Sequence, residues 1–130
     1  MSSVRAIIAG HGDFADGMIS AIEQIAGRSE AFLGLTNRGL SAADVEALMR
    51  ERLDTTGVSV VFTDLPAGSC TMAARRLQRE RPGLRIVTGV NLAALLDFVF
   101  GTDGGDADAV AHAVEKGRAA LVVAGTSRGG

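Results

Sequence analysis

Apolar residues along the chain follow two alternating spacings. Short apolar or β-branched runs, such as V-R-A-I-I-A at 4–9, are typical of buried strands. Between such runs, apolar residues recur three or four positions apart, as in Met18, Ile22 and Ile25, which is the spacing of one helix face. The pattern predicts strands over 4–9, 31–35, 58–63, 84–88 and 119–124, and helices over 14–26, 41–53, 69–79, 91–100 and 106–116.

Residues that suit helix ends lie at the boundaries of the predicted helices. Gly27 is placed to end the first helix, because glycine readily takes the left-handed conformation that follows a last turn. Ser41 and Asp44 resemble a capping box, with aspartate in place of the usual glutamate. Ser69 and Asn91 each carry a short polar side chain that can cap the helix after it. These signals support separate helices between the strands.

The alternation of strands and helices predicts the fold class. Strands joined by single helices run parallel, and a parallel sheet buries both of its faces under helices. We therefore predict an α/β fold with a doubly wound, mainly parallel sheet of about five strands. One domain is expected over 1–125, because no repeat or linker interrupts the pattern in a chain of 130 residues. The residues T-S-R-G-G at 126–130 are expected to form a flexible tail.

Composition and charge exclude several classes of function. Apolar residues make up 47% of the chain, enough for a core, whereas aromatic residues make up only 4%. With few aromatic side chains and a net charge of -2, the chain is not expected to bind nucleic acid. The sequence contains no recognisable signal peptide and no apolar run that could span a membrane. The single cysteine suits a reducing compartment, so a cytoplasmic location is expected.

The strongest candidate for chemistry is His11. It lies in the segment G-H-G at 10–12, directly after the first predicted strand, where glycines on both sides allow close approach of another molecule. Asp64 follows another predicted strand, and open α/β sheets usually bind ligands at this edge. A carboxylate that accepts a hydrogen bond from one ring nitrogen leaves the other nitrogen as a nucleophile. His11 and Asp64 are therefore predicted to act together.

The segment A-G-S-C-T at 67–71 adds a candidate anion site. It leads into a predicted helix, where free backbone amides and the helix dipole favour negative charge. Ser69 and Thr71 add hydroxyl donors. With His11 and Asp64, this segment predicts a site suited to transient transfer of a phosphoryl group to and from histidine. No nucleotide-binding glycine motif is present in the sequence.

Other polar residues have simpler interpretations. Asp13 and Asp16 match no metal-ligand spacing, and neither a metal nor a cofactor is predicted. The second histidine, His112, lies in an amphipathic helical pattern and is expected at the surface. A hydrolase that uses Cys70 or Ser69 as nucleophile, with the first histidine as base, stays open as an alternative function.

Three collinear segments resemble one protein family. They are I-I-A-G-H-G-D-F-A-D-G-M at 7–18, F-T-D-L-P-A-G-S at 62–69 and V-T-G-V-N-L-A-A-L-L at 87–96. With the helices between them, these segments resemble the EIIA component of the mannose-class bacterial phosphotransferase system, which includes mannose, fructose, sorbose and N-acetylgalactosamine branches. The resemblance covers nearly the whole chain.

The resemblance implies a cytoplasmic phosphotransferase that serves sugar transport through a phosphohistidine intermediate. His11 would accept phosphate on Nε2 from the phosphocarrier HPr and pass it to an EIIB domain, which in turn serves the membrane components EIIC and EIID. Asp64 would be the hydrogen-bonded partner of His11, and Gly68 and Ser69 would belong to the phosphate loop. The resemblance also implies a homodimer, in which the strand at 119–124 pairs across subunits.

One loop departs from the family pattern. The family commonly has Gly-Gly-Ser/Thr-Pro, whereas this chain has A-G-S-C at 67–70. Loss of the proline restores a backbone N–H at the helix start. The tract C-T-M-A-A at 70–74 is similar to the N-acetylgalactosamine branch. The altered loop keeps a second interpretation open, namely a regulatory or interaction module in which phosphorylation of the histidine is a signal.

Overall fold

Four parallel strands form one sheet in the computed structural model, which describes residues 3–101 and 104–125. In the spatial order β2-β1-β3-β4, the sheet contains β2 (Phe32–Thr36), β1 (Ala6–Gly10), β3 (Val60–Thr63) and β4 (Arg85–Val87). The helices are α1 (Phe14–Ala26), the short 3-10 turn η1 (Ser29–Ala31), α2 (Ala42–Thr56), α3 (Ser69–Glu80), α4 (Leu92–Phe100) and α5 (Gly105–Ala120). The predicted α/β fold with a doubly wound parallel sheet is confirmed.

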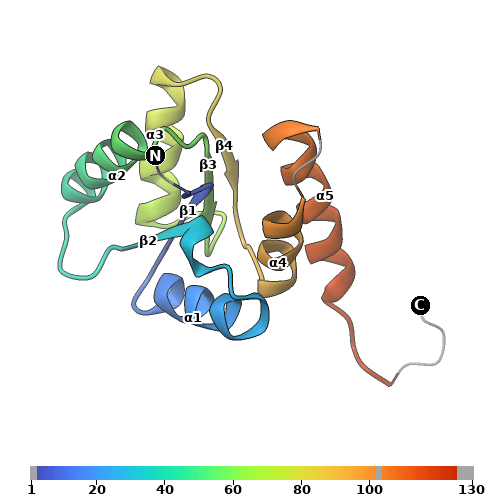
Figure 1. The fold of residues 1–130 in the computed structure, drawn as a ribbon. Coiled ribbons are helices and arrows are strands. Elements are labelled where there is room, and N and C mark those ends of the chain that lie inside the picture. Colours follow the sequence, from blue (N-terminus) through green and yellow to red (C-terminus); the bar gives the residue numbers. More distant parts are fainter. Residues whose placement is uncertain (1–2, 102–103, 126–130) are drawn as a thin grey trace.

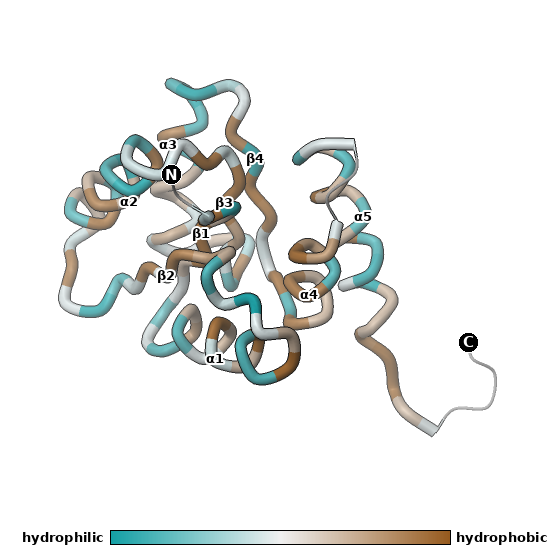
Figure 2. The backbone as a smooth tube through the Cα atoms, in the orientation of Figure 1, coloured by the Kyte–Doolittle hydropathy of each residue, from teal (hydrophilic) through white to brown (hydrophobic). Residues whose placement is uncertain are grey.

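The core lies on both faces of the sheet. Successive side chains of β1 point to opposite faces, so Ile8 packs with α1, α4 and α5 while Ile7 packs with α2 and α3. Figure 1 shows these two helical layers on either side of the strands, and Figure 2 shows the strands at the centre in the hydrophobic colours. On the first face, the rings of Phe62 and Phe98 meet edge to face with centroids 5.0 Å apart. Both faces are covered, so the accessible parts of the sheet are the ends of its strands and its two outer edges.

Most of the predicted helix ends are confirmed. Ser41 and Asp44 form the capping box at the start of α2, and the Asn91 side chain accepts a hydrogen bond from a backbone amide at the start of α4. Gly27 ends α1 in the left-handed conformation. Ser69 differs from the prediction, because Gly68 is the capping residue of α3 and Ser69 is its first helical residue. The Ser69 hydroxyl is therefore not used as a cap.

The predicted strand at 119–124 is not present in this chain. Helix α5 continues through Ala120, since alanine is the strongest helix former and a strand needs a neighbouring edge with which to pair. Leu121 and Val122 follow the helix with 83% and 72% of their surface exposed. Figure 1 shows this segment running away from the sheet. The predicted flexible tail at 126–130 lies outside the described residues.

Parallel pairing brings the ends of three strands to one edge of the sheet. Gly10 at the end of β1 lies opposite Thr36 at the end of β2, and Ala9 lies opposite Thr63 at the end of β3. The loops that follow these strands therefore start side by side. Among the helices of the described residues, none is long and apolar enough to cross a membrane.

Candidate functional site

His11 and Asp64 form the centre of the candidate site. Nδ1 of His11 lies 2.7 Å from Oδ2 of Asp64, and the same oxygen accepts a hydrogen bond from the backbone amide of His11 at 2.9 Å. The His11 side chain is 49% exposed, whereas that of Asp64 is 12% exposed. The carboxylate is thus largely covered, and the ring it holds stays open to solvent. This is the adjacency predicted from the two strand ends.

Gly10 makes this adjacency possible. A Cβ atom at position 10 would lie 2.9 Å from Oδ2 of Asp64 and 2.7 Å from the Phe14 ring, closer than real Cβ atoms approach other heavy atoms. Any side chain here would push the carboxylate away from His11. Glycine is therefore required at the end of β1 for the carboxylate to approach so closely.

The protonation of the pair follows from the environment of Asp64. Partial burial opposes its ionisation, but the hydrogen bonds from the His11 ring and from the His11 amide outweigh burial, and the pKa of Asp64 lies below its usual value. An ionised carboxylate can only accept hydrogen bonds, so Nδ1 of His11 carries the shared proton. In the neutral ring, Nε2 then holds a free lone pair.

The start of α3 faces the Cε1–Nε2 side of the His11 ring. Gly68 has φ +125°, and a Cβ atom there would lie 3.0 Å from Cε1 and 3.7 Å from Nε2 of His11. The amides of Ser69, Cys70 and Thr71 belong to the first turn of α3, where helices leave their N–H groups without intrahelical acceptors. Nε2 therefore lies beside a helix N-terminus, which favours an anion.

The two hydroxyls expected at the anion site have different surroundings. Oγ of Ser69 is half-buried and receives a hydrogen bond from the side-chain amide of Asn37 at 2.8 Å. Thr71 is buried, and its hydroxyl lies 2.6 Å from the carbonyl oxygen of Leu65 and 2.7 Å from the Thr63 hydroxyl. The geometry does not support the expectation that the Thr71 hydroxyl binds phosphate, because it is already used inside the loop. Its backbone amide still belongs to the helix N-terminus.

Sequence reasoning missed the contribution of the loop after β2. Asn37 contacts Ser69, and Arg38 forms an ion pair with Asp13 at 2.9 Å. The signal was present, because Asn37 is the first polar residue after a strand whose end lies beside that of β1. The predicted strand ends at residue 35, one residue before β2 ends in the structure, so Asn37 lies outside the predicted site.

Cys70 lies in an environment that opposes nucleophilic chemistry. The side chain is fully buried on the sheet face of α3. Burial, together with the negative charge of Asp64, raises the pKa of the thiol to about 11. A buried thiol that stays protonated at neutral pH argues against the hydrolase alternative in its cysteine form.

A second histidine–carboxylate pair lies away from this edge. Nδ1 of His112 in α5 is 2.7 Å from Oδ2 of Asp97 in α4, and the His112 side chain is 58% exposed. The expected surface position of His112 is confirmed. The His112–Asp97 contact between two helices has the same geometry at Nδ1 as the His11–Asp64 contact. It differs in that the start of α3 faces the His11 ring and not the His112 ring.

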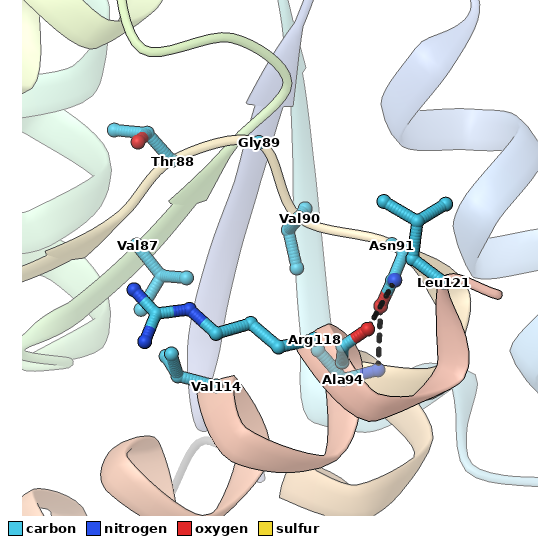
Figure 3. Close-up of a pocket in the computed structure, with 10 residues that line it drawn as sticks. Val87, Thr88, Gly89, Val90, Asn91, Ala94, Val114, Arg118 and Leu121 are labelled. Carbon is cyan, nitrogen blue, oxygen red and sulfur yellow. Dashed lines mark hydrogen bonds between the residues drawn. The ribbon is translucent and has the colours of Figure 1, made fainter. Parts of the chain in front are cut away.

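A shallow pocket of about 210 Å³ lies between β4 and the helices α4 and α5. Figure 3 shows Arg118 extending along it toward Val87, and Asn91 bonded to the backbone on both sides. Gly117 permits this packing, because a Cβ atom there would lie 2.8 Å from the Ala94 side chain. The pocket contains neither His11 nor Asp64, so it is separate from the candidate site.

The fold and the site together define a doubly wound α/β protein with a carboxylate-oriented histidine at the carboxyl edge of its sheet. The chain belongs to the EIIA-man family, described as the PTS system fructose IIA component, whose family model matches residues 5–115. The protein is therefore a component of a sugar phosphotransferase system. No curated protein sequence matches the chain significantly.

Solved structures of similar proteins have the same fold. The phosphotransferase system component EIIA from Streptococcus agalactiae is 27% identical, with a TM-score of 0.82 over 92% of this chain and 96% of that one. The mannose/sorbose specific IIA subunit from Enterococcus faecalis is 22% identical, with a TM-score of 0.80 over 92% and 93% of the two chains. The PTS IIA protein associated with the fucose utilization operon of Streptococcus pneumoniae is also 22% identical, with a TM-score of 0.78 over 95% and 96%.

Proposed function

We propose that the protein is a phosphoryl carrier that accepts phosphate from HPr on Nε2 of His11 and passes it to an EIIB domain. EIIB would then serve sugar uptake through EIIC and EIID, which places the carrier in the cytoplasm. The observation that carries this proposal is the position of the His11 ring. Nδ1 is held by Asp64, and the Cε1–Nε2 side of the ring faces the start of α3 beside Gly68.

The transfer step uses these groups in a simple way. The lone pair of Nε2 attacks phosphorus, and the bond between phosphorus and the donor nitrogen breaks as the new nitrogen–phosphorus bond forms. Nδ1 keeps its proton and its hydrogen bond to Asp64, whose charge stabilises the ring as it becomes more positive. Because phosphoryl transfer needs little covalent assistance, positioning and charge stabilisation supply most of the catalysis. Transfer to EIIB reverses these steps on a different acceptor.

The start of α3 would hold the phosphoryl oxygens. We assign this role to the amides of the first turn, including those of Ser69 and Thr71, and to the Ser69 hydroxyl. The glycine at position 68 lets the helix start come within reach of Nε2. We assign the Thr71 hydroxyl to support of the loop, since it bonds to the Leu65 carbonyl.

Reconstitution tests the proposal directly. The protein is incubated with phosphoenolpyruvate, enzyme I and HPr, and we expect it to gain one acid-labile phosphate. Addition of an EIIB domain should then remove the label. An EIIB of the N-acetylgalactosamine branch is the first acceptor to use, given the similarity at 70–74. Absence of labelling would contradict the carrier function, and stable labelling that no EIIB discharges would favour the signalling module.

We also propose that the protein is a homodimer in which the segment after α5 pairs with the partner subunit. Leu121 and Val122 are large apolar residues left highly exposed, and Figure 2 shows this segment in hydrophobic colours beyond α5. Among residues 3–101 and 104–125, β4 pairs with β3 alone, so its outer edge is available for a further strand. A strand from a second subunit would satisfy that edge and cover the apolar segment.

The dimer proposal predicts that Val122→Asp yields a monomer. A buried, uncompensated charge in the exchanged segment opposes its association with the partner subunit. Light scattering after size-exclusion chromatography gives the mass of each species. Ile25→Asp is the matched control, because Ile25 is also a highly exposed apolar residue but lies on α1. A monomeric wild type, or a dimeric Val122→Asp variant, would contradict the proposal.

A further inference from the structure

The loop after β2 is fixed against the loop that carries His11. The Thr36 hydroxyl donates to the carbonyl of Gly12 at 2.9 Å, and its oxygen accepts from the amide of Arg38 at 3.2 Å. The Arg38 guanidinium then pairs with Asp13 on the far side of the turn. Residue 37 therefore leaves the sheet beside His11 in a defined position.

From this position, Asn37 reaches the start of α3. Its side-chain nitrogen lies 2.8 Å from Oγ of Ser69, and both side chains are half-buried. The contact joins two loops that are 32 positions apart in the sequence. It connects the end of β2 to the residue that follows Gly68, next to the His11 ring.

The direction of this hydrogen bond determines what Ser69 can do. A serine hydroxyl has one proton to donate and an oxygen that accepts, whereas an amide nitrogen only donates. Because Asn37 donates to Oγ, the bond occupies a lone pair of Ser69 and leaves its proton for another acceptor. Within residues 3–101 and 104–125, the Ser69 hydroxyl donates to no oxygen atom; it interacts with the neighbouring Cys70 thiol, whose sulfur is only a weak acceptor. A phosphoryl oxygen on Nε2 of His11 is the acceptor that the proposed function brings to this place.

We infer that Asn37 is a positioning residue for phosphoryl transfer, which holds the Ser69 hydroxyl so that a phosphoryl oxygen bound to His11, a stronger acceptor than the Cys70 sulfur, can take its proton in a hydrogen bond. The inference rests on the proposed function and adds a third strand end to the site. Asn37 does not itself contact the phosphoryl group in this arrangement, and its effect passes through Ser69. The Ser69 hydroxyl oriented in this way binds a hydrogen-bond acceptor, and the oxygen atoms of a phosphoryl group are such acceptors.

Single-turnover transfer from phosphorylated HPr at saturating donor measures this effect. Ser69→Ala removes the donor, and we expect the rate to fall roughly tenfold, as for loss of one hydrogen bond to a charged group. Asn37→Ala removes the hydrogen bond that orients the Ser69 hydroxyl and is expected to lower the rate by about fivefold. Asn37→Asp presents an acceptor that captures the Ser69 proton, so it is expected to be slower than Asn37→Ala.

A double-mutant cycle separates positioning from general support of the loop. If Asn37 acts through Ser69, Asn37→Ala has no further effect, within about twofold, once Ser69 is alanine. Ser59→Ala is the matched control: it removes another half-buried side-chain hydrogen bond, to Asp106, just before the start of β3 and away from the edge that carries His11, and we expect a rate within about twofold of the wild type. Urea unfolding of each variant measures its stability and shows whether it is folded under the conditions of the transfer assay.

The outcomes distinguish this inference from the proposed function. Failure of the wild type to accept phosphate would contradict the carrier function itself. Normal labelling of the wild type with additive effects of Asn37→Ala and Ser69→Ala would overturn only the role of Asn37. Asn37→Asp that is as fast as Asn37→Ala would also overturn it. The slow rate of Asn37→Asp should persist at high salt. Salt screens long-range repulsion between the new carboxylate and phosphate, but it does not break the short hydrogen bond from the Ser69 hydroxyl to that carboxylate.

Discussion

Replacement of His11 by glutamine is expected to abolish phosphate uptake from HPr. The proposed chemistry needs a ring nitrogen with a free lone pair beside the start of α3, and glutamine offers a donor and an acceptor but no such nucleophile. The measurement is incorporation of acid-labile label in the reconstituted system. We expect the label to fall to background, because no other described group has this arrangement.

The chain supplies a close control in His112→Gln. Both histidines have an exposed ring, and both bring Nδ1 to 2.7 Å from a carboxylate oxygen. Only His11 also faces the helix start at Gly68. Full labelling of the His112 variant would show that a carboxylate partner alone does not make a phosphoryl acceptor. Residual labelling of the His11 variant, or loss of labelling in the His112 variant, would place the acceptor elsewhere.

The centre of the site could be predicted from the sequence because it depends on short-range rules. Strands that alternate with helices run parallel, and parallel strands all end at one edge of the sheet, so His11 and Asp64 lie at the same edge. They lie close together there only if β1 and β3 are neighbouring strands. The order β2-β1-β3-β4 makes them neighbours. Their separation of 2.7 Å additionally depends on Gly10, whose role follows from a steric contact that no sequence pattern expresses.

Other parts of the site could not be predicted because they depend on side-chain directions between distant loops. Thr71 and Ser69 both suit an anion site by composition, yet one hydroxyl turns into the loop and the other is reached by Asn37. A shift of one residue in the start of α3 is enough to change these directions, since successive helical positions differ by about 100°. Similarly, the strand at 119–124 has strand-like composition, but within one chain no edge pairs with it.

Gly68→Ala is expected to lower the transfer rate roughly a hundredfold while the protein stays folded. At φ +125° an alanine is strained, and its Cβ atom would lie 3.0 Å from Cε1 of His11. Either the ring or the start of α3 must move, and both changes separate Nε2 from the amides proposed to hold phosphate. Single-turnover transfer from phosphorylated HPr measures the rate, and urea unfolding measures stability.

Gly57→Ala separates this steric effect from backbone strain. Gly57 also has a positive φ, at +73°, but no neighbouring atom of the described residues lies within 4 Å of the Cβ position. It ends α2 before the start of β3, whereas Asp64 follows the other end of that strand. The alanine there is expected to cost about 1–2 kcal/mol of stability and to leave the transfer rate within about twofold. If both variants lose stability but only Gly68→Ala loses transfer, the distance between His11 and the start of α3 controls the reaction. Equal transfer rates in the two variants would mean that Nε2 does not use the start of α3, and the anion site would have to lie on another side of the ring.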